Sequence, residues 1–272
     1  MNIKKLILPL AAMMLLSGCS GCKGAEEPVK SPDATPQVVV VTPEPTDTAE
    51  TWPEELGDPQ VYKDLYKQIK ESEEINSDVV GWIYFPSGLV SQPVLHGTDN
   101  AFYLRHDWKT GNSLEWGSIY VDFRNNINNN DMNTIIYGNY VYKSYSSDRT
   151  LVFTPLAQLR EEENYEPNKY VTLITDTEIR LYELAHVFDC PTVYISAGQV
   201  PAEGFEFNEL TFTDEKLVSL INNIKGIEFY HTGVEIEPGD RLMMMQTCVE
   251  FHTEVRQINV CKEIGRYPIP EE

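Results

Sequence analysis

The sequence is poor in positive charge, in histidine and in cysteine. Its 272 residues include 21 Lys and Arg against 42 Asp and Glu, so the formal net charge is −21. A surface of this sign repels nucleic acid and anionic lipid headgroups, and we expect neither as a ligand. The five histidines and five cysteines form no constellation typical of a metal site, so we expect no metal and no other cofactor.

Long apolar runs are scarce too, and the clearest one lies at the N-terminus. Lys4 and Lys5 form a charged start, and the apolar run over residues 6–16 is too short to span a bilayer. The run ends in Leu-Ser-Gly-Cys at Cys19, which resembles a lipobox. We therefore expect a lipoprotein signal peptide over residues 1–18 and a lipid anchor on Cys19 at the extracellular face of the cell membrane. The alternative is an ordinary secretory signal with a chance cysteine.

The few cysteines do not form a disulfide framework. Two lie close to the N-terminus, which leaves Cys190, Cys248 and Cys261 for the rest of the chain. An odd number of cysteines in an exported protein indicates at least one free, reactive thiol. Cys190 and Cys261 lie in apolar stretches and are predicted core residues. A disulfide from Cys248 to either of them stays open at this level.

The chain divides into a tether and a folded domain. Residues 19–52 are rich in proline, threonine and acidic side chains. Proline removes backbone donors, and little in this stretch can be buried, so we predict a disordered, extended tether. Folded sequence begins near Pro53, and we expect one domain over residues 53–272.

Within this domain the apolar pattern predicts a mainly β fold. Apolar residues recur at helical spacing over residues 60–75, which predicts an amphipathic helix. A second helix is expected from Thr213 or Asp214 to Lys225. Alternating stretches predict strands over residues 80–84, 117–123, 134–137, 169–175, 178–188, 240–248 and 255–264. Many short strands with few helices are typical of a closed β-barrel, here with an N-terminal helix and another inserted before the penultimate strand.

Several separated stretches are similar to class B sortases. They are residues 76–83, 93–94, 99–107, 117–126, 134–138 and 246–248, the last followed by Arg256. Each stretch is short, but their order and spacing match as well, and the resemblance covers about residues 60–264. The resemblance implies a sortase-like β-barrel and a cysteine transpeptidase of the Gram-positive cell envelope.

The resemblance also implies the role of two residues. Cys248 stands in the place of the nucleophile, which attacks a backbone carbonyl in the sorting signal of a surface protein and forms a thioacyl enzyme. An amine of a peptidoglycan precursor or pilin then resolves it. Arg256 stands in the place of the cation that stabilises the oxyanion, a task that suits a permanently charged guanidinium. The alternatives are a small buried cysteine and a solvated or ion-paired arginine.

One position departs from the family pattern in the catalytic loop. Family members have a histidine after Tyr137 and Gly138, whereas this chain has Asn139. An amide does not titrate in the accessible range and cannot act as a general acid, a role typically worth about 10²–10⁴-fold in rate. His252, in the predicted turn shortly after Cys248, is the best substitute base. The other histidines are expected to be surface or hydrogen-bonded residues: His96, His106, His186 and His231.

Three further departures concern the substrate pocket and the anchor. Gln246 stands where serine is more frequent, the loop over residues 140–149 is rich in Tyr and Ser, and a lipobox replaces the usual membrane-spanning anchor. The leading hypothesis is a working sortase-like transpeptidase. The second is a catalytically impaired pseudosortase lipoprotein that binds sorting-signal-like peptides or an envelope partner, and the third is a surface lipoprotein with an unrelated ligand. Cys248 with Arg256 favours the first two, and Asn139 favours impaired chemistry.

Overall fold

The computed structural model describes residues 52–128, 131–195, 198–249 and 252–271, without the side chains of residues 194–195, 198–199 and 252–254. These residues belong to one compact unit, Glu50–Glu272. The expected signal peptide, the lipidated Cys19 and the expected tether up to residue 51 lie outside the described residues. Within the described ranges, no helix has the length and apolar character needed to cross a membrane.

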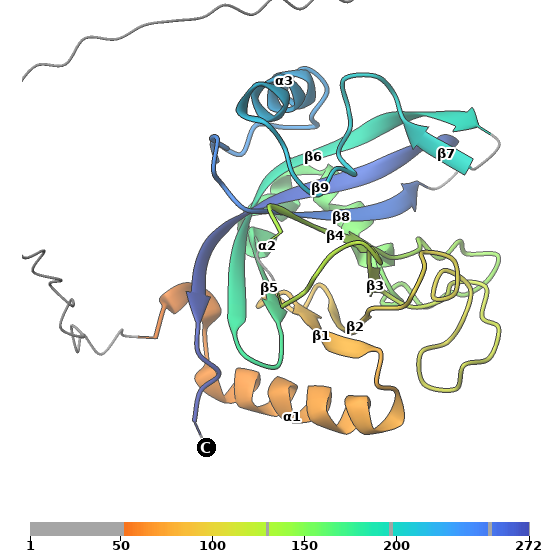
Figure 1. Ribbon diagram of the computed structural model, residues 1–272, viewed down its shortest axis with the longest axis vertical. Helices are drawn as coiled ribbons and strands as arrows, with labels where there is room; N and C mark the ends of the chain where they lie inside the picture. The colour runs from red at the N-terminus through yellow and green to blue at the C-terminus, as the bar shows by residue number, and fades with distance from the viewer. Residues whose placement is uncertain (1–51, 129–130, 196–197, 250–251, 272) are drawn as a thin grey trace, which may run out of the picture. The chain divides into compact units, whose positions relative to one another are not determined.

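Eight strands close into the predicted β-barrel (Figure 1). They are β1 (Val79–Tyr84), β2 (Ser91–Leu95), β3 (Tyr120–Val121), β4 (Asn133–Tyr137), β5 (Tyr170–Ile174), β6 (Ile179–Ile195), β8 (Leu242–Val249) and β9 (His252–Tyr267). Their order is β5-β1-β2-β3-β4-β8-β9-β6, and β6 pairs with β5 to close the circle. A further strand, β7 (Gly198–Pro201), pairs only with the far end of β6 and forms a hairpin beside the barrel.

The first long helix covers one side of the barrel. Helix α1 (Pro59–Ile75) begins after Asp58, whose carboxylate accepts a hydrogen bond from the Gln60 backbone N–H at 2.9 Å. Its apolar stripe contains Tyr62, Leu65 and Ile69, which pack in one cluster with residues of β1, β5 and β6. The predicted N-terminal helix is therefore confirmed, and its amphipathic pattern reflects this contact.

The second long helix covers the opposite part of the barrel (Figure 1). Helix α3 (Asp214–Lys225) is capped by the Thr213 hydroxyl and precedes β8, as predicted. Its buried residues pack in one cluster with residues of β6, β8 and β9. The remaining helices are short: Glu54–Leu56, Thr154–Arg160, Glu162–Asn164 and α2 (Tyr165–Asn168).

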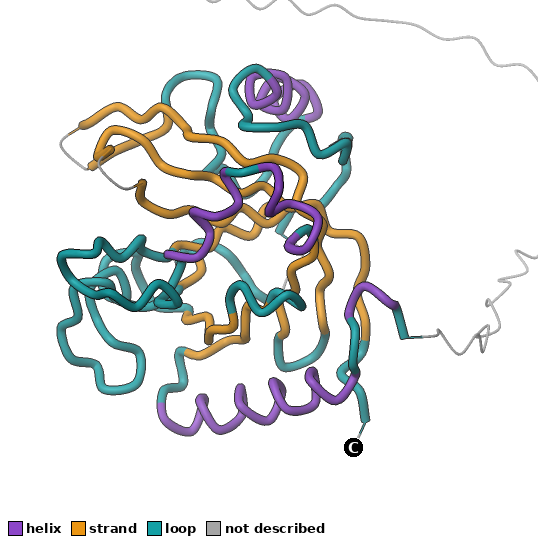
Figure 2. Tube along the Cα trace, turned by 180° about the vertical axis from the view of Figure 1, so that it is seen from behind, coloured by secondary structure: helices purple, strands orange, loops and turns teal. Residues whose placement is uncertain are grey.

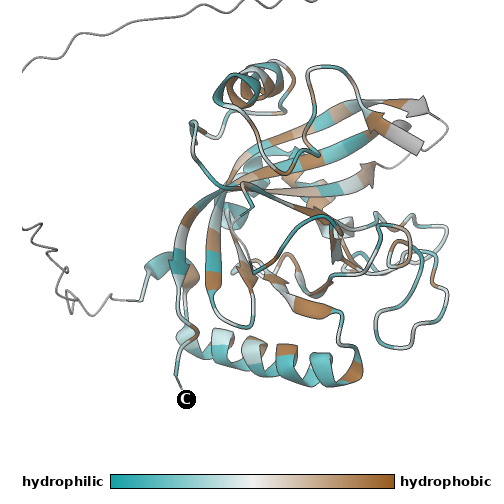
Figure 3. Cartoon of the chain, in the orientation of Figure 1, coloured by the Kyte–Doolittle hydropathy of each residue, from teal (hydrophilic) through white to brown (hydrophobic). Residues whose placement is uncertain are grey.

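The alternation along β8 decides which way its last residues face. Met243 and Met245 belong to the cluster inside the barrel, whereas Leu242 and Met244 belong to the cluster beneath α3. Successive strand residues point to opposite faces, so Cys248 shares the outer face with Leu242 and Met244. The strand is buried on both faces over most of its length, and Figure 3 shows it as largely hydrophobic toward its start.

The predicted strand over residues 117–123 is mostly wrong, because only Tyr120 and Val121 pair with a neighbour. Gly117 has a φ of 52°, and a Cβ there would lie 2.2 Å from the Tyr103 carbonyl oxygen. The Ser118 N–H also donates to Tyr103, so this segment turns against the preceding loop instead of extending. Long loops of this kind gather on one side of the barrel (Figure 2). Strands β2 and β7 were not predicted, and β6 is longer than predicted.

Closure of the barrel predicts a severe effect of a methyl group at Gly81 in β1. A Cβ there would lie 2.3 Å from the Ile174 carbonyl oxygen of β5, which is backbone and cannot move away. We expect Gly81→Ala to lower the free energy of unfolding by about 1–3 kcal/mol or more, measured by urea denaturation.

Gly226→Ala is the matched control. Gly226 has right-handed helical dihedrals at the end of α3, and a Cβ there would lie 3.2 Å from the Asn223 carbonyl oxygen, so alanine requires a shift of only a few tenths of an ångström. We expect stability to be unchanged or to rise by about 0.4–1 kcal/mol. Equal losses in the two variants would contradict the close approach of β1 and β5.

Candidate active site

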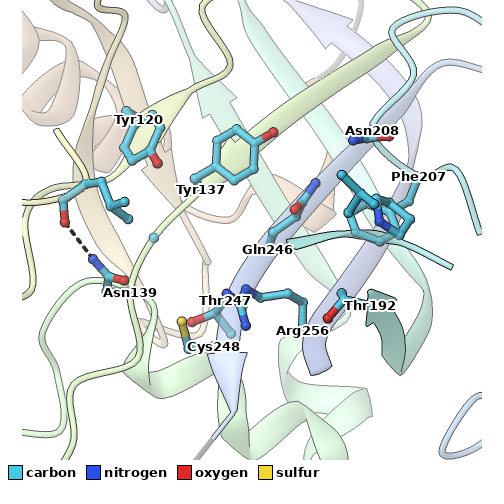
Figure 4. A pocket seen from close by; sticks show the side chains of 14 residues that line it. Tyr120, Tyr137, Asn139, Thr192, Phe207, Asn208, Gln246, Thr247, Cys248 and Arg256 are labelled. Carbon is cyan, nitrogen blue, oxygen red and sulfur yellow. Dashed lines mark hydrogen bonds between the residues drawn. The ribbon is translucent and has the colours of Figure 1, made fainter. Parts of the chain in front are cut away.

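A pocket of about 240 Å³ lies over the outer faces of β4 and β8 (Figure 4). Cys248, Arg256 and Asn139 all line it, so the structure brings the three candidate residues together. Residues of β3, β4 and β8 line one part: Tyr120, Tyr137, Gln246 and Thr247. The β6–β7 hairpin and the connection that follows it line another: Thr192, Val200, Pro201, Phe207 and Asn208.

Cys248 and Arg256 are direct cross-strand partners. Strands β8 and β9 pair antiparallel, and Cys248 lies opposite Arg256 in the register. Directly opposed residues have Cβ atoms about 4.5–5.5 Å apart and side chains on the same face. The guanidinium therefore lies beside the half-buried thiol, where a permanent positive charge can stabilise a thiolate or an oxyanion formed at the sulfur (Figure 4).

The other two thiols of the described chain are separated from Cys248 by the fold. All three are free. Cys190 lies opposite Arg256 on the far side of β9, and two strand spacings of about 9–10 Å exceed the reach of a disulfide. Cys261 is buried inside the barrel, on the other face of β9 from Arg256, as alternation predicts. Burial raises the pKa of Cys190 to about 12 and also raises that of Cys261, so neither competes as a nucleophile.

The side chain of Asn139 links the loop after β4 to the connection between β2 and β3. It is 8% exposed, and its Nδ2 donates to the Leu104 carbonyl at 2.9 Å and to the Trp116 carbonyl at 3.1 Å. Both amide hydrogens are thus used to hold the connection between β2 and β3 against the pocket (Figure 4). The side chain keeps only an acceptor oxygen for other contacts, and it cannot protonate a leaving amine.

Among the histidine side chains that the structure describes, none lines this pocket. The His96 ring lies 3.2 Å from the Phe123 carbonyl oxygen. His106 stacks on Phe102 with ring centroids 4.2 Å apart. These two are surface residues with a local partner, as predicted.

The remaining histidines also have other partners or lie outside the described side chains. His186 is fully buried with its Nδ1 2.5 Å from Glu228, and His231 lies 3.2 Å from the other oxygen of that carboxylate. Burial lowers the pKa of His186 although Glu228 opposes this. His252 is the first residue of β9 and pairs with Val249, instead of lying in a turn as predicted, and its side chain is not described.

Two adjacent polar side chains of β8, Gln246 and Thr247, are buried beside the pocket, and Gln246 shares the outer face with Cys248. Gln246 is 7% exposed and Thr247 is 2% exposed. The Gln246 Nε2 and the Thr247 Oγ1 have no hydrogen-bond partner within the described part of the chain. A buried, unpaired donor costs about 1–3 kcal/mol, so a ligand with an amide or carbonyl oxygen would satisfy Gln246. The sequence marked Gln246 only as a departure from the family pattern.

The sequence did not single out the other lining residues. Phe207 and Asn208 lie in an irregular connection between β7 and α3, and Thr192 lies beyond the predicted end of β6. No local pattern distinguishes these residues from ordinary loop or strand residues. Their contribution follows from the tertiary fold, which places the β6–β7 hairpin and the connection after it along the same pocket as Cys248.

Comparisons with known proteins agree with this geometry. The chain is 29% identical over 187 residues to sortase B of Staphylococcus aureus, which covers 69% of this chain and 70% of the relative. It is 25% identical over 186 residues to sortase B of Listeria monocytogenes, covering 66% and 67%. The crystal structure of Clostridium perfringens sortase B superposes with a TM-score of 0.59 at 26% identity, over 72% of this chain and 99% of that one. The chain is thus similar to the class B sortases in both sequence and fold.

These relatives indicate that the protein is a sortase-type cysteine transpeptidase. No protein-family model matches the chain, so the assignment rests on these relatives and on the barrel. They do not favour the pseudosortase hypothesis. The identities are modest, and the individual roles of Cys248, Arg256 and Asn139 stay predictions from the family pattern.

The hydrogen bonds of Asn139 predict a loop effect that is separate from any loss of stability. Asn139→Ala leaves two carbonyls without their donor, so we expect the free energy of unfolding to fall by about 1–3 kcal/mol. Because Leu104 lines the pocket, release of its carbonyl should also make Cys248 react faster with iodoacetamide. Both quantities are measured on the same purified variant.

Asn168→Ala is the matched control, since Asn168 is also 8% exposed and makes two hydrogen bonds, but does not line the pocket. We expect a similar loss of stability with an unchanged alkylation rate. Equal alkylation in Asn139→Ala and the wild type would mean that Asn139 does not hold the pocket closed.

Proposed function

We propose that this sortase cleaves the sorting signal of surface proteins with Cys248 as the nucleophile and Arg256 as the cation for the oxyanion. The observation that supports this most is the cross-strand pairing of Cys248 with Arg256 at the pocket. The acceptor is an amine of a peptidoglycan precursor or of a pilin. Cys19 carries a lipid anchor at the extracellular face of the membrane.

The reaction proceeds in two half-reactions. The Cys248 thiol first loses its proton to water, the thiolate then attacks the carbonyl carbon of the scissile amide, and the new oxyanion lies beside the guanidinium of Arg256. Collapse breaks the C–N bond, and the leaving amine takes up a proton. The acceptor amine then attacks the thioester, loses a proton and releases the Cys248 thiolate.

Proton transfer is the slow part of this scheme. Asn139 donates both amide hydrogens to backbone carbonyls, so it supplies no proton to the leaving amine. Water takes this role at the half-buried thiol. Loss of general acid–base help typically costs about 10²–10⁴-fold, whereas binding and oxyanion stabilisation persist without it. We therefore propose slow turnover, in which protonation limits the rate.

Mass spectrometry of the protein with a randomised peptide library tests the proposal directly. We expect a thioacyl adduct on Cys248 that hydroxylamine releases and that Cys248→Ala abolishes. Arg256→Ala should slow adduct formation by about 10²–10³-fold, because it removes the oxyanion cation. Arg266→Ala is the control, since Arg266 is also a half-buried arginine of β9 but pairs with Glu263 away from the pocket.

Two results would contradict the proposed mechanism. No adduct with any library peptide would contradict the proposed reaction and favour the pseudosortase hypothesis. Adduct formation that is equally slow in Arg256→Ala and Arg266→Ala would remove Arg256 from the proposed mechanism.

Asn139→His should restore part of the missing chemistry. An imidazole can donate one N–H to a loop carbonyl and accept the thiol proton on its other nitrogen. We expect faster alkylation of Cys248 by iodoacetamide near neutral pH. Asn168→His, at an equally buried site outside the pocket, should leave the rate unchanged.

An unchanged rate in Asn139→His would show that position 139 does not act on the sulfur. The same assay also examines the other candidate base. If His252→Ala abolishes thioacyl formation, His252 supplies the proton transfer, and protonation by water is wrong.

A further inference from the structure

A buried carboxylate lies behind the pocket, at the end of β3. Asp122 is fully buried, and its Oδ1 accepts from the Arg124 backbone N–H at 3.0 Å and from Nε at 2.8 Å. Its Oδ2 accepts from Arg124 Nη2 at 2.9 Å, from the Tyr137 hydroxyl at 2.8 Å and from Asn100 Nδ2 at 3.0 Å. Burial pushes the pKa of Asp122 upward, but these hydrogen bonds outweigh it and hold the pKa below its ordinary value.

Arg124 connects Asp122 to the part of the pocket formed by Phe207 and Asn208, which we call the wall. Its Nη2 also donates to the Asn208 carbonyl at 2.9 Å, although the two residues are far apart in the sequence. Asn208 and its neighbour Phe207 line the pocket. One guanidinium therefore holds a buried carboxylate on β3 and the backbone of the wall at the same time.

Asp122 also binds a residue on the side of the pocket that faces the wall, namely Tyr137. Tyr137, whose hydroxyl donates to Asp122, lines the pocket directly next to Gly138 and Asn139. Tyr120 also lines the pocket, and its hydroxyl donates to the carbonyl of Asn100, the third partner of Asp122. Asp122 is thus linked to residues on both sides of the space in which a peptide would lie.

A residue of the barrel, Asn133, also forms hydrogen bonds with the wall. The Nδ2 of the buried Asn133 donates to the Phe207 carbonyl at 3.1 Å and to the Glu209 carbonyl at 2.9 Å. Asn133 lies at the start of β4, so these hydrogen bonds hold residues 207–209 against the barrel. Arg124, in contrast, binds the carbonyl of Asn208, which lines the pocket. The contribution of Arg124 can therefore be measured separately from that of Asn133.

We propose that Asp122 and Arg124 form a positioning pair that sets the spacing between Tyr137 and the wall at Phe207 and Asn208, and with it the affinity for the peptide substrate. Neither residue lines the pocket or touches the reacting atoms. The pair therefore acts on substrate binding and leaves the reactivity of Cys248 unchanged. This inference rests on the proposed function for its substrate, but its effect on the wall is independent of it.

The geometry of the guanidinium explains why an arginine is needed. A planar fork can bind both carboxylate oxygens and still present a hydrogen to a carbonyl at its edge. A lysine ammonium keeps the charge but lacks this fixed fork. Arg124 is 41% exposed, so a substitution there leaves no large cavity.

The test compares Arg124→Lys with the wild type in three measurements. Peptide-resolved hydrogen exchange should show faster exchange of the wall over residues 205–210. The KM of the library peptide that acylates Cys248 fastest should rise about tenfold or more, with little change in kcat. Alkylation of Cys248 by iodoacetamide should be unchanged.

Arg266→Lys is the matched control, because Arg266 makes the same kind of two-pronged ion pair with Glu263 and lies outside the pocket. It should alter none of the three measurements. Asp122→Asn should repeat the Arg124→Lys result. If that buried substitution prevents folding, the half-exposed Arg124 variant decides the matter alone.

Unchanged hydrogen exchange of the wall in Arg124→Lys, or a fall in kcat at constant KM, would overturn the positioning pair. A wild-type protein that forms no adduct with any peptide would instead refute the proposed function. In that case the exchange measurement still decides whether Arg124 holds the wall, so the two failures are distinguishable.

Discussion

The antiparallel pairing of β8 with β9 is the constraint on which the site depends. It places Cys248 directly opposite Arg256, and the alternation along β8 keeps the sulfur on the outer face of the barrel. A slip of one residue would exchange the two faces of the strand. The sulfur would then lie in the core, where burial raises the pKa of a thiol, as it does at Cys261.

The surroundings of the thiol are unequal on its two sides. Arg256 supplies a fixed positive charge from the neighbouring strand, whereas Asn139 supplies a neutral amide that is already committed to two backbone carbonyls. The site can therefore stabilise negative charge better than it can move a proton. The loops around Cys248 gain order from Asn139, because two loop carbonyls receive their donors from a single side chain.

One buried carboxylate, that of Asp122, has a structural role in this acidic chain. With a formal net charge of −21, most carboxylates repel one another on the surface. Asp122 is different, because it is fully buried and surrounded by donors from Arg124, Tyr137 and Asn100. Such a group is costly to leave unpaired, and this is why it can hold residues from distant parts of the chain in one arrangement.

The sequence by itself determined the mainly β class, the two long helices and the hairpin that carries Cys248 and Arg256. These features depend on local alternation, on helix caps and on the order of short motifs, all of which can be recognised along the chain. The segment around Gly117 was misjudged, because its alternation resembles a strand while its backbone bonds to a distant loop.

Only the tertiary structure decided how the pocket is built. It brought Phe207 and Asn208 to the Cys248 face and showed that the hydrogens of Asn139 are used by the Leu104 and Trp116 carbonyls. The physical reason is that these contacts join residues many positions apart. They exist only after the barrel has closed, and no periodicity in the sequence encodes them.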